Sequence, residues 1–302
     1  MAAMSAGQMH PDMHPIDDGL VRRLVAGQFP QWAGLAVERW PSGGTVNAMY
    51  RLGEELVVRL PLVRGGAGDV SMEQAWLPRL GAQLPTGIPE VLGVGVPAER
   101  YPWPWSVYRW LTGEHPEAGA LSQPVLLAED LAAFVAAMRS ITLPGAPKAH
   151  RGGPLASLDA ETRAAIDELR GIPEEDVDCD AVAAVWEEAL SAPGWGGPPV
   201  WLHADLMPGN LLVDGGRLAS VIDFGCAGVG DPACDLFPAW NLLPPDACEV
   251  FREALGVDDA TWIRGRGRTL SQAVIALPYY RTTNPAMARN ARHVIRAVLD
   301  EG

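Results

Sequence analysis

The stretch that decides the fold reads His-Ala-Asp-Leu-Met-Pro-Gly-Asn over residues 203–210, and Asp223-Phe224-Gly225 follows it. The carboxylate of Asp205 stands five residues before the amide of Asn210, and Asp223 comes thirteen residues after that amide. Between Asn210 and Asp223, two short strand-like runs are joined by a turn that begins with Asp214-Gly215, which predicts a β-hairpin. The stretch therefore predicts one carboxylate and two further oxygen donors attached to the ends of a short, rigid element.

This set of donors suits phosphoryl transfer. The reaction needs a carboxylate beside the acceptor hydroxyl and hard oxygen ligands for Mg²⁺, because its acceleration comes mainly from positioning and charge stabilisation. We assign the first role to Asp205 and the second to the side-chain oxygens of Asn210 and Asp223.

A third motif completes the pattern, Gly-Asp-Pro-Ala-Cys-Asp-Leu over residues 230–236. With it, the sequence resembles the aminoglycoside phosphotransferase and choline kinase family, whose members carry H-G-D-x-x-P-x-N, I-D-F or I-D-W, and G-D-P-x-x-D-L-A in this order. The departures are Ala204 in place of the usual glycine and Phe237 in place of a small residue, and neither removes a reactive group. The resemblance implies that His203 and Asp235 support the catalytic loop instead of reacting.

The resemblance also implies a protein-kinase-like, two-lobed α+β fold, with a small antiparallel-sheet lobe followed by a larger, mainly helical lobe. The hydrophobic patterning agrees with it. We expect a flexible N-terminal tail over 1–16, a nucleotide-binding lobe over 17–112, and a catalytic and acceptor-binding lobe over 113–302. Strands are expected at 35–40, 46–52, 56–62, 90–96 and 106–111, and helices at 72–77, 125–141 and 159–169, the first ending or kinking at Pro78 and the last capped by Asp159.

Arg59 stands where protein kinases have the lysine that pairs with the nucleotide phosphates. The guanidinium can serve because it forms two parallel bonds to a phosphate or a carboxylate. Glu73, fourteen positions later, is the expected ion-pair partner. The resemblance places the loop over the phosphates at Ser42, Gly43, Gly44 and Thr45, and the hinge whose backbone holds the adenine edge at Arg109, Trp110 and Leu111.

Two absences distinguish the chain from protein kinases. The loop has His-Ala-Asp where many protein kinases have His-Arg-Asp, and only five residues separate Gly225 from Asp231. An activation segment that supports a polypeptide substrate does not fit into that interval, so we expect a small-molecule acceptor.

The charge balance bears on partners. The chain of 302 residues has 23 Lys and Arg against 37 Asp and Glu, a net charge of −14, which argues against nucleic acid or an anionic membrane as a partner. The only lysine is Lys148, so a phosphate-binding cation in the strand region must be an arginine. An acidic run ordinarily marks a solvated face, but it could bind a cationic acceptor here, and its acids are Glu174, Glu175, Asp176, Asp178 and Asp180. Arg264, Arg266 and Arg268 are expected on a solvated helix face.

Three remaining features of the sequence indicate the cellular compartment of the protein. The four cysteines form no Cys-x-x-Cys pair, the N-terminal stretch lacks the pattern of a signal peptide, and no apolar run approaches the length of a membrane helix. We therefore expect a cytoplasmic protein.

Together these observations predict a Mg²⁺-dependent kinase that transfers the γ-phosphoryl of ATP or GTP to a hydroxyl of a small molecule, with an aminoglycoside-like antibiotic as the first candidate acceptor. Macrolides, nucleoside antibiotics, amino alcohols and sugars stay open. So does a nucleotide-binding regulator that has lost catalysis, against which the intact Asp205, Asn210 and Asp223 argue. A metal-dependent hydrolase built on His203 and Asp205 is a third alternative, but the sequence lacks a second histidine cluster.

Overall fold

The computed structural model describes residues 13–41 and 46–301, and the chain forms two compact units. The first unit comprises Met1–Gln83, Gly87–Thr112 and Ser220–Gly225, and the second comprises Leu84–Thr86, Gly113–Ala219 and Cys226–Gly302. The first unit therefore contains a segment from far down the chain. A single boundary after residue 112, as predicted from the sequence, does not describe this division.

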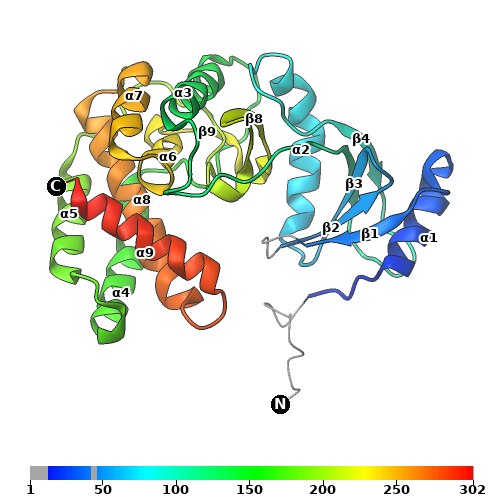
Figure 1. Cartoon of the computed structure of the whole chain (residues 1–302), viewed down its shortest axis with the longest axis horizontal. Coiled ribbons are helices and arrows are strands. Elements are labelled where there is room, and N and C mark those ends of the chain that lie inside the picture. Colours follow the sequence, from blue (N-terminus) through cyan, green and yellow to red (C-terminus); the bar gives the residue numbers. More distant parts are fainter. Residues whose placement is uncertain (1–12, 42–45, 302) are drawn as a thin grey trace. The chain divides into compact units, whose positions relative to one another are not determined.

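A five-stranded antiparallel sheet forms the centre of the first unit, with strand order β1-β2-β3-β5-β4 (Figure 1). Its strands are β1 (Val37–Trp40), β2 (Asn47–Leu52), β3 (Leu56–Pro61), β4 (Val91–Gly95) and β5 (Trp105–Arg109). The helices of this unit are α1 (Asp18–Gln28), the short 3₁₀ turn η1 (Pro30–Trp32) and α2 (Gly66–Gly81).

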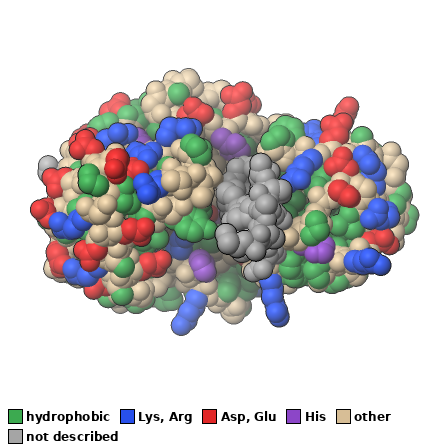
Figure 2. Space-filling model, turned by 90° about the horizontal axis from the view of Figure 1, so that it is seen from below, with side chains coloured by type: hydrophobic (Ala, Val, Ile, Leu, Met, Phe, Trp, Pro, Cys, Tyr) green, Lys and Arg blue, Asp and Glu red, His purple; other side chains and the backbone are tan. Residues whose placement is uncertain are grey.

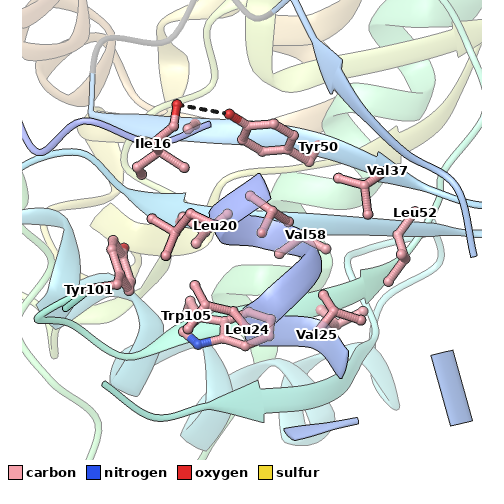
Figure 3. Packing of buried hydrophobic residues seen from close by; sticks show 14 of the residues in the cluster. Ile16, Leu20, Leu24, Val25, Val37, Tyr50, Leu52, Val58, Tyr101 and Trp105 are labelled. Atoms are coloured by element: carbon pink, nitrogen blue, oxygen red, sulfur yellow. Dashed lines mark hydrogen bonds between the residues drawn. The ribbon is translucent and has the colours of Figure 1, made fainter. Parts of the chain in front are cut away.

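The two α-helices of the unit cover opposite faces of the sheet. Successive side chains of a strand point to opposite faces. In β3, Val58 packs in the core that α1 completes, whereas the neighbouring Arg59 bonds to Glu73 of α2. Figure 3 shows Leu20 and Leu24 of α1 among the sheet side chains of this core, and it also shows Ile16, whose carbonyl accepts a bond of 3.1 Å from the Tyr50 hydroxyl.

Two local predictions need correction here. The tail predicted over 1–16 is wrong at its end, because Ile16 lies in the core and the His14 N–H donates to the Leu62 carbonyl at 2.8 Å; residues 1–12 lie outside the described part. The helix expected at 72–77 begins instead at Gly66, and it ends at Gly81, just past Pro78. Glycine is required at its start, since a Cβ on Gly66 would lie 2.9 Å from the Val46 side chain.

The second unit is mainly helical. Its helices are α3 (Pro124–Ser140), α4 (Asp159–Arg170), α5 (Cys179–Ser191), α6 (Pro238–Asn241), α7 (Pro245–Leu255), α8 (Asp259–Tyr280) and α9 (Pro285–Asp300). Short 3₁₀ turns occur at η2 (Leu155–Leu158), η3 (Pro173–Glu175), η4 (Pro208–Asn210) and η6 (Pro232–Leu236). Strand β6 (Val200–Leu202) pairs with β9 (Gly228–Gly230). The predicted hairpin consists of β7 (Leu211–Asp214) and β8 (Arg217–Val221), and it leads through Asp223 to the turn η5 (Phe224–Cys226).

The predicted fold class is thus confirmed: a sheet-centred unit precedes a larger, mainly helical one. One cap differs from expectation. Asp159 is the first residue of α4 and not its N-cap, because its carboxylate accepts bonds from Arg163 (2.7 Å) and from the Trp186 indole (2.9 Å).

Charged side chains of both signs are spread over the surface shown in Figure 2. Acidic and basic side chains are interspersed on the face shown in Figure 2, so the net charge of −14 is not gathered into one acidic field there. Among the described residues, we find no helix with the length and apolar character needed to cross a membrane.

Candidate active site

A buried ion pair lies at the centre of the first unit. Arg59 of β3 and Glu73 of α2 are 7% and 1% exposed, and Nη1 of the arginine donates to Oε1 of the glutamate at 2.7 Å. The same Oε1 accepts the Phe224 N–H at 3.1 Å, and Oε2 accepts the Tyr108 hydroxyl. Burial, followed by the adjacent Glu73 carboxylate, raises the pKa of Tyr108, so this hydroxyl stays protonated and donates. Glu73 therefore joins strand, helix and the segment after β8 within one unit.

Arg59 also holds the predicted metal-binding aspartate. Its Nη2 donates to Oδ1 of Asp223 at 2.9 Å and lies 3.9 Å from Oδ2 of Asp69, in the first turn of α2. With its amide turned so that the oxygen faces Arg59, Asn47 accepts from Nη2 at 2.8 Å and from Nε at 3.0 Å. Burial alone would lower the pKa of Arg59, but Glu73 and Asp223 more than offset it and raise that pKa above its ordinary value. The guanidinium is therefore permanently charged, and its role toward nucleotide phosphates stays a prediction.

The predicted hinge has much of its backbone already engaged. The N–H of Arg109 donates to the Glu90 carbonyl at 3.1 Å, and the N–H of Trp110 donates to the Glu55 carbonyl at 2.7 Å. The Trp110 ring lies against the Arg51 guanidinium, 3.8 Å from its centroid. The N–H groups of Arg109 and Trp110 are thus bonded within the first unit, and the backbone role toward adenine of Arg109, Trp110 and Leu111 stays a prediction. The loop predicted at Ser42, Gly43, Gly44 and Thr45 lies outside the described residues.

The second unit contains the predicted catalytic loop, and a buried carboxylate fixes its beginning. Asp235 is fully buried and accepts the N–H groups of His203 (2.8 Å) and Ala204 (2.7 Å). Ala204 has φ +65°, in the left-handed region that glycine occupies most readily, so the loop holds a side-chain-bearing residue in a conformation that favours glycine. Burial raises the pKa of Asp235, while His203, the two N–H donors and Arg139 oppose that shift. His203 is buried, and its Nδ1 accepts the Asp205 N–H at 3.3 Å, which fits a supporting imidazole.

Both oxygens of the Asp205 carboxylate are held by side chains. The Asn210 amide nitrogen donates to Oδ2 at 3.0 Å and to the Asp205 carbonyl at 2.8 Å. Nη1 of Arg151 donates to Oδ1. Because its nitrogen faces Asp205, the Asn210 amide directs its oxygen away from the aspartate, as a metal ligand at this position requires.

The two predicted Mg²⁺ ligands lie in different units, Asn210 in the second and Asp223 in the first, and each offers a hard oxygen. Asn210 offers an amide oxygen, and Asp223 offers a carboxylate that is 45% exposed and bound to Arg59 through one oxygen. Among residues 13–41 and 46–301, no group of three or more His, Cys, Asp and Glu side chains could hold a metal. Mg²⁺ typically takes one or two protein carboxylates and completes its shell with substrate phosphates and water, so the oxygen of each side chain is of the kind that Mg²⁺ prefers.

The acidic run has mostly structural partners. Glu175 forms a two-point salt bridge with Arg292 (2.6 and 2.8 Å), Asp178 caps α5, and Asp180 pairs with Arg170 at 2.7 Å. Three of the five acids proposed for a cationic acceptor thus already serve the fold. Glu174 and Asp176 are exposed, in η3 and at its end.

The Glu175–Arg292 bridge predicts a pH-dependent stability. The bond to Arg292 lowers the pKa of Glu175 below its ordinary 4.5, with burial opposing. A depressed carboxylate pKa contributes stability above the ordinary value, and that stability is lost as the pH falls through the folded value. Glu175→Gln is expected to cost about 1 kcal/mol at pH 7, which lowers Tm by about 2–4 °C, and the difference from wild type should shrink below pH 4.5.

Thermal melts of both proteins between pH 3 and pH 7 measure this difference. Asp180→Asn is the matched control, because its salt bridge lies on the surface with the Asp180 side chain 85% exposed. A constant gap between wild type and Glu175→Gln over the whole pH range would contradict the assignment.

The arginines of α8 correct another expectation. Arg264 and Arg268 are 3% and 2% exposed, not solvated, and Arg264 forms a two-point salt bridge with Asp231 (2.9 and 3.0 Å). The contact between Arg151 and the Asp205 carboxylate was not predicted from the sequence. Arg151 lies in a Gly-rich loop 54 positions away, and only the scarcity of lysine could have directed attention to the arginines.

Comparisons with known proteins identify the family of the chain and its fold. A sequence model of the phosphotransferase enzyme family matches residues 39–270. No curated protein matches the sequence. Among solved structures, the GDP and kanamycin complex of APH(2″)-IIia is similar with a TM-score of 0.75 and 19% identity, over 93% of this chain and 99% of that one.

Two macrolide enzymes are similar as well. Macrolide 2′-phosphotransferase MphH from Brachybacterium faecium gives a TM-score of 0.62 at 20% identity, over 93% of this chain and 98% of that one. Macrolide 2′-phosphotransferase type I gives 0.63 at 17% identity, over 97% and 98%. At these identities the likeness shows the fold, whereas the family match extends over residues 39–270 of the 302. The chain therefore belongs to the phosphotransferase enzyme family, as the motifs of its catalytic loop predict.

Proposed function

We propose that this phosphotransferase moves the γ-phosphoryl group of ATP or GTP to a hydroxyl of a small-molecule antibiotic. The observation that carries the proposal is the loop of Asp205 and Asn210, whose peptide is held by the buried Asp235 and whose carboxylate is held on both oxygens. A carboxylate held in this way is suited to orienting an acceptor hydroxyl, and such positioning is the main demand of phosphoryl transfer.

In the proposed mechanism, Asp205 accepts a hydrogen bond from the acceptor hydroxyl and takes its proton as the phosphoryl group is transferred. Asn210 and Asp223 would hold Mg²⁺, which when bound neutralises charge on the phosphates. Arg59 keeps Asp223 and Glu73 in place within the first unit and adds a permanent positive charge there. Because phosphoryl transfer makes little covalent demand on the protein, these electrostatic and positioning roles account for the residues present.

An aminoglycoside is the first candidate acceptor. Solved structures of similar fold include complexes with kanamycin, gentamicin and streptomycin. The net charge of −14 favours a cationic substrate in general terms.

A macrolide is the second candidate, and two observations favour it. Macrolide 2′-phosphotransferases are among the similar structures. Moreover, three acids of the acidic run already bond within the chain, namely Glu175, Asp178 and Asp180. This weakens the argument that the run binds a polycationic aminoglycoside.

A coupled assay of nucleoside diphosphate release tests the proposal. Purified chain with Mg²⁺ and either ATP or GTP is offered kanamycin, gentamicin, streptomycin, a macrolide, and a panel of nucleosides, amino alcohols and sugars. We expect release that depends on one acceptor class, and mass spectrometry should show that acceptor gaining a phosphoryl group. Chelation of Mg²⁺ should reduce the rate to background.

The assay separates the alternatives. Nucleotide binding without acceptor-dependent release across the panel would identify a regulator instead of an antibiotic kinase. Nucleoside diphosphate release with only a sugar or an amino alcohol as acceptor would support a small-molecule kinase and contradict the proposal that the acceptor is an antibiotic.

A further inference from the structure

A cation from outside the catalytic loop contacts its aspartate. Arg151 lies in the loop between α3 and α4, and its Nη1 donates to Oδ1 of Asp205 and, at 3.5 Å, to the Ala204 carbonyl. From His203 to Asn210 the catalytic loop contains no arginine or lysine. The charge of Asp205 is thus balanced by a residue 54 positions away in the sequence.

The backbone beneath Arg151 is fixed by buried groups. Arg268 of α8, 2% exposed, donates through Nη1 to the Arg151 carbonyl and through Nη2 to the Gly153 carbonyl, both at 2.6 Å. The buried Cys234 thiol also donates to the Arg151 carbonyl at 3.5 Å, and the neighbouring His150 N–H donates to the Cys226 carbonyl at 3.0 Å. The backbone from which the Arg151 side chain extends is therefore held in place by the fold.

The two side chains that contact the Asp205 carboxylate bind different oxygens. Asn210 holds Oδ2 and Arg151 holds Oδ1, so rotation of the carboxylate would break one bond or the other. Burial would lower the pKa of Arg151, but Asp205 raises it further and keeps the guanidinium charged. The Arg151 side chain is 36% exposed and that of Asp205 17%, so the pair can be reached from solvent.

We infer that Arg151 is a positioning residue for Asp205: together with Asn210, it fixes the orientation of the carboxylate. The inference rests on the proposed function, in which Asp205 receives the acceptor hydroxyl. Without the guanidinium, the carboxylate is free to turn about its Asn210 contact. This loss of orientation acts on the chemical step and hardly on nucleotide affinity.

A double-mutant cycle tests the inference, using the acceptor that gives the highest turnover in the assay above. Arg151→Ala is expected to lower kcat about 100-fold, the size of effect that a misplacement of about 1 Å produces. The KM for the nucleotide should change less than about threefold, since an interaction expressed in the transition state lowers kcat alone. In an Asp205→Ala background, the same substitution should cause no further loss, because a residue that acts through Asp205 has nothing left to position.

Rescue and control variants distinguish positioning from a structural role. Added guanidinium ion, well below unfolding concentrations, should restore part of the activity of Arg151→Ala but none of that of Asp205→Ala. Arg151→Lys should fall between wild type and Arg151→Ala, since it keeps the charge and loses the planar fork. Arg252→Ala, which removes a comparably exposed arginine (37%) paired with Asp259, should leave kcat unchanged.

The outcomes separate the two proposals. Absence of phosphoryl transfer by the wild type overturns the proposed function and, with it, the role of Arg151. Turnover that Asp205→Ala abolishes and Arg151→Ala leaves intact overturns only the inference, as does an equal loss in the Asp205→Ala background. If Arg151→Ala does not fold, Arg151→Met keeps the apolar stem and removes the charge, and the same comparison of kcat applies.

Discussion

Replacing Asp205 by alanine is expected to lower turnover by about 10²–10⁴-fold, the contribution typical of a positioned acid or base. Nucleotide affinity should stay within a few-fold of wild type, because the contacts of Asp205 that the structure describes are with Asn210, Arg151 and the loop itself. Steady-state release of nucleoside diphosphate measures the first quantity, and calorimetric titration with the nucleotide measures the second.

Two variants make the comparison specific. Asp205→Asn keeps the shape of the side chain and removes the charge, so it should be nearly as slow as Asp205→Ala. Asp246→Ala removes an exposed aspartate of α7 in the same unit and should retain full turnover. Unchanged turnover in either Asp205 variant would remove this residue from the chemistry.

Glu73→Ala is expected to have the largest effect on stability, a loss of about 3–5 kcal/mol, because breaking a buried ion pair leaves an uncompensated charge. Glu73 is 1% exposed, and its loss leaves the Arg59 Nη1, the Tyr108 hydroxyl and the Phe224 N–H without the acceptor they share. The loss appears as a lower midpoint of urea unfolding, followed by tryptophan fluorescence.

The first unit provides its own control. Arg109 and Glu90 form a salt bridge with the same N–O distance of 2.7 Å, but both side chains are half exposed, at 50% and 58%. Exposed pairs of this kind contribute little, so Glu90→Ala should unfold at the urea concentration of wild type. Equal midpoints for Glu73→Ala and Glu90→Ala would show that burial of the Arg59–Glu73 pair has no energetic weight.

Local patterns predicted most of the elements. The five strands of the first unit appear within a few residues of their expected ranges, because alternation and turn residues are local signals. The start of α2 was missed because residues 65–68 contain three glycines, which read as a loop, whereas close packing against Val46 is the reason for glycine at 66. Asp159 was taken for a cap because the sequence does not show Trp186, whose indole binds that carboxylate.

Some residues of the candidate site could likewise be predicted from the sequence, and others could not. Asp205, Asn210 and Asp223 could be predicted because their spacing is itself the signal, and the pairing of Arg59 with Glu73 was expected from their positions in strand and helix. Arg151 could not be predicted, because a lone arginine before two glycines carries no periodicity, and its partner is fixed only by tertiary structure. The acidic run was misjudged for a related reason: Arg292, which binds Glu175, lies 117 positions further on.

The inclusion of Ser220–Gly225 in the first unit limits how the gene can be divided. A fragment that stops at Thr112 lacks Asp223 and Phe224, and so deprives Arg59 and Glu73 of partners they have in the whole chain. Such a fragment would expose a half-neutralised cluster of buried charge. Residues 1–112 alone therefore cannot be moved into another protein as the sheet unit, and a two-piece reporter made from this enzyme needs its break after Gly225, so that all parts of the first unit stay on one piece.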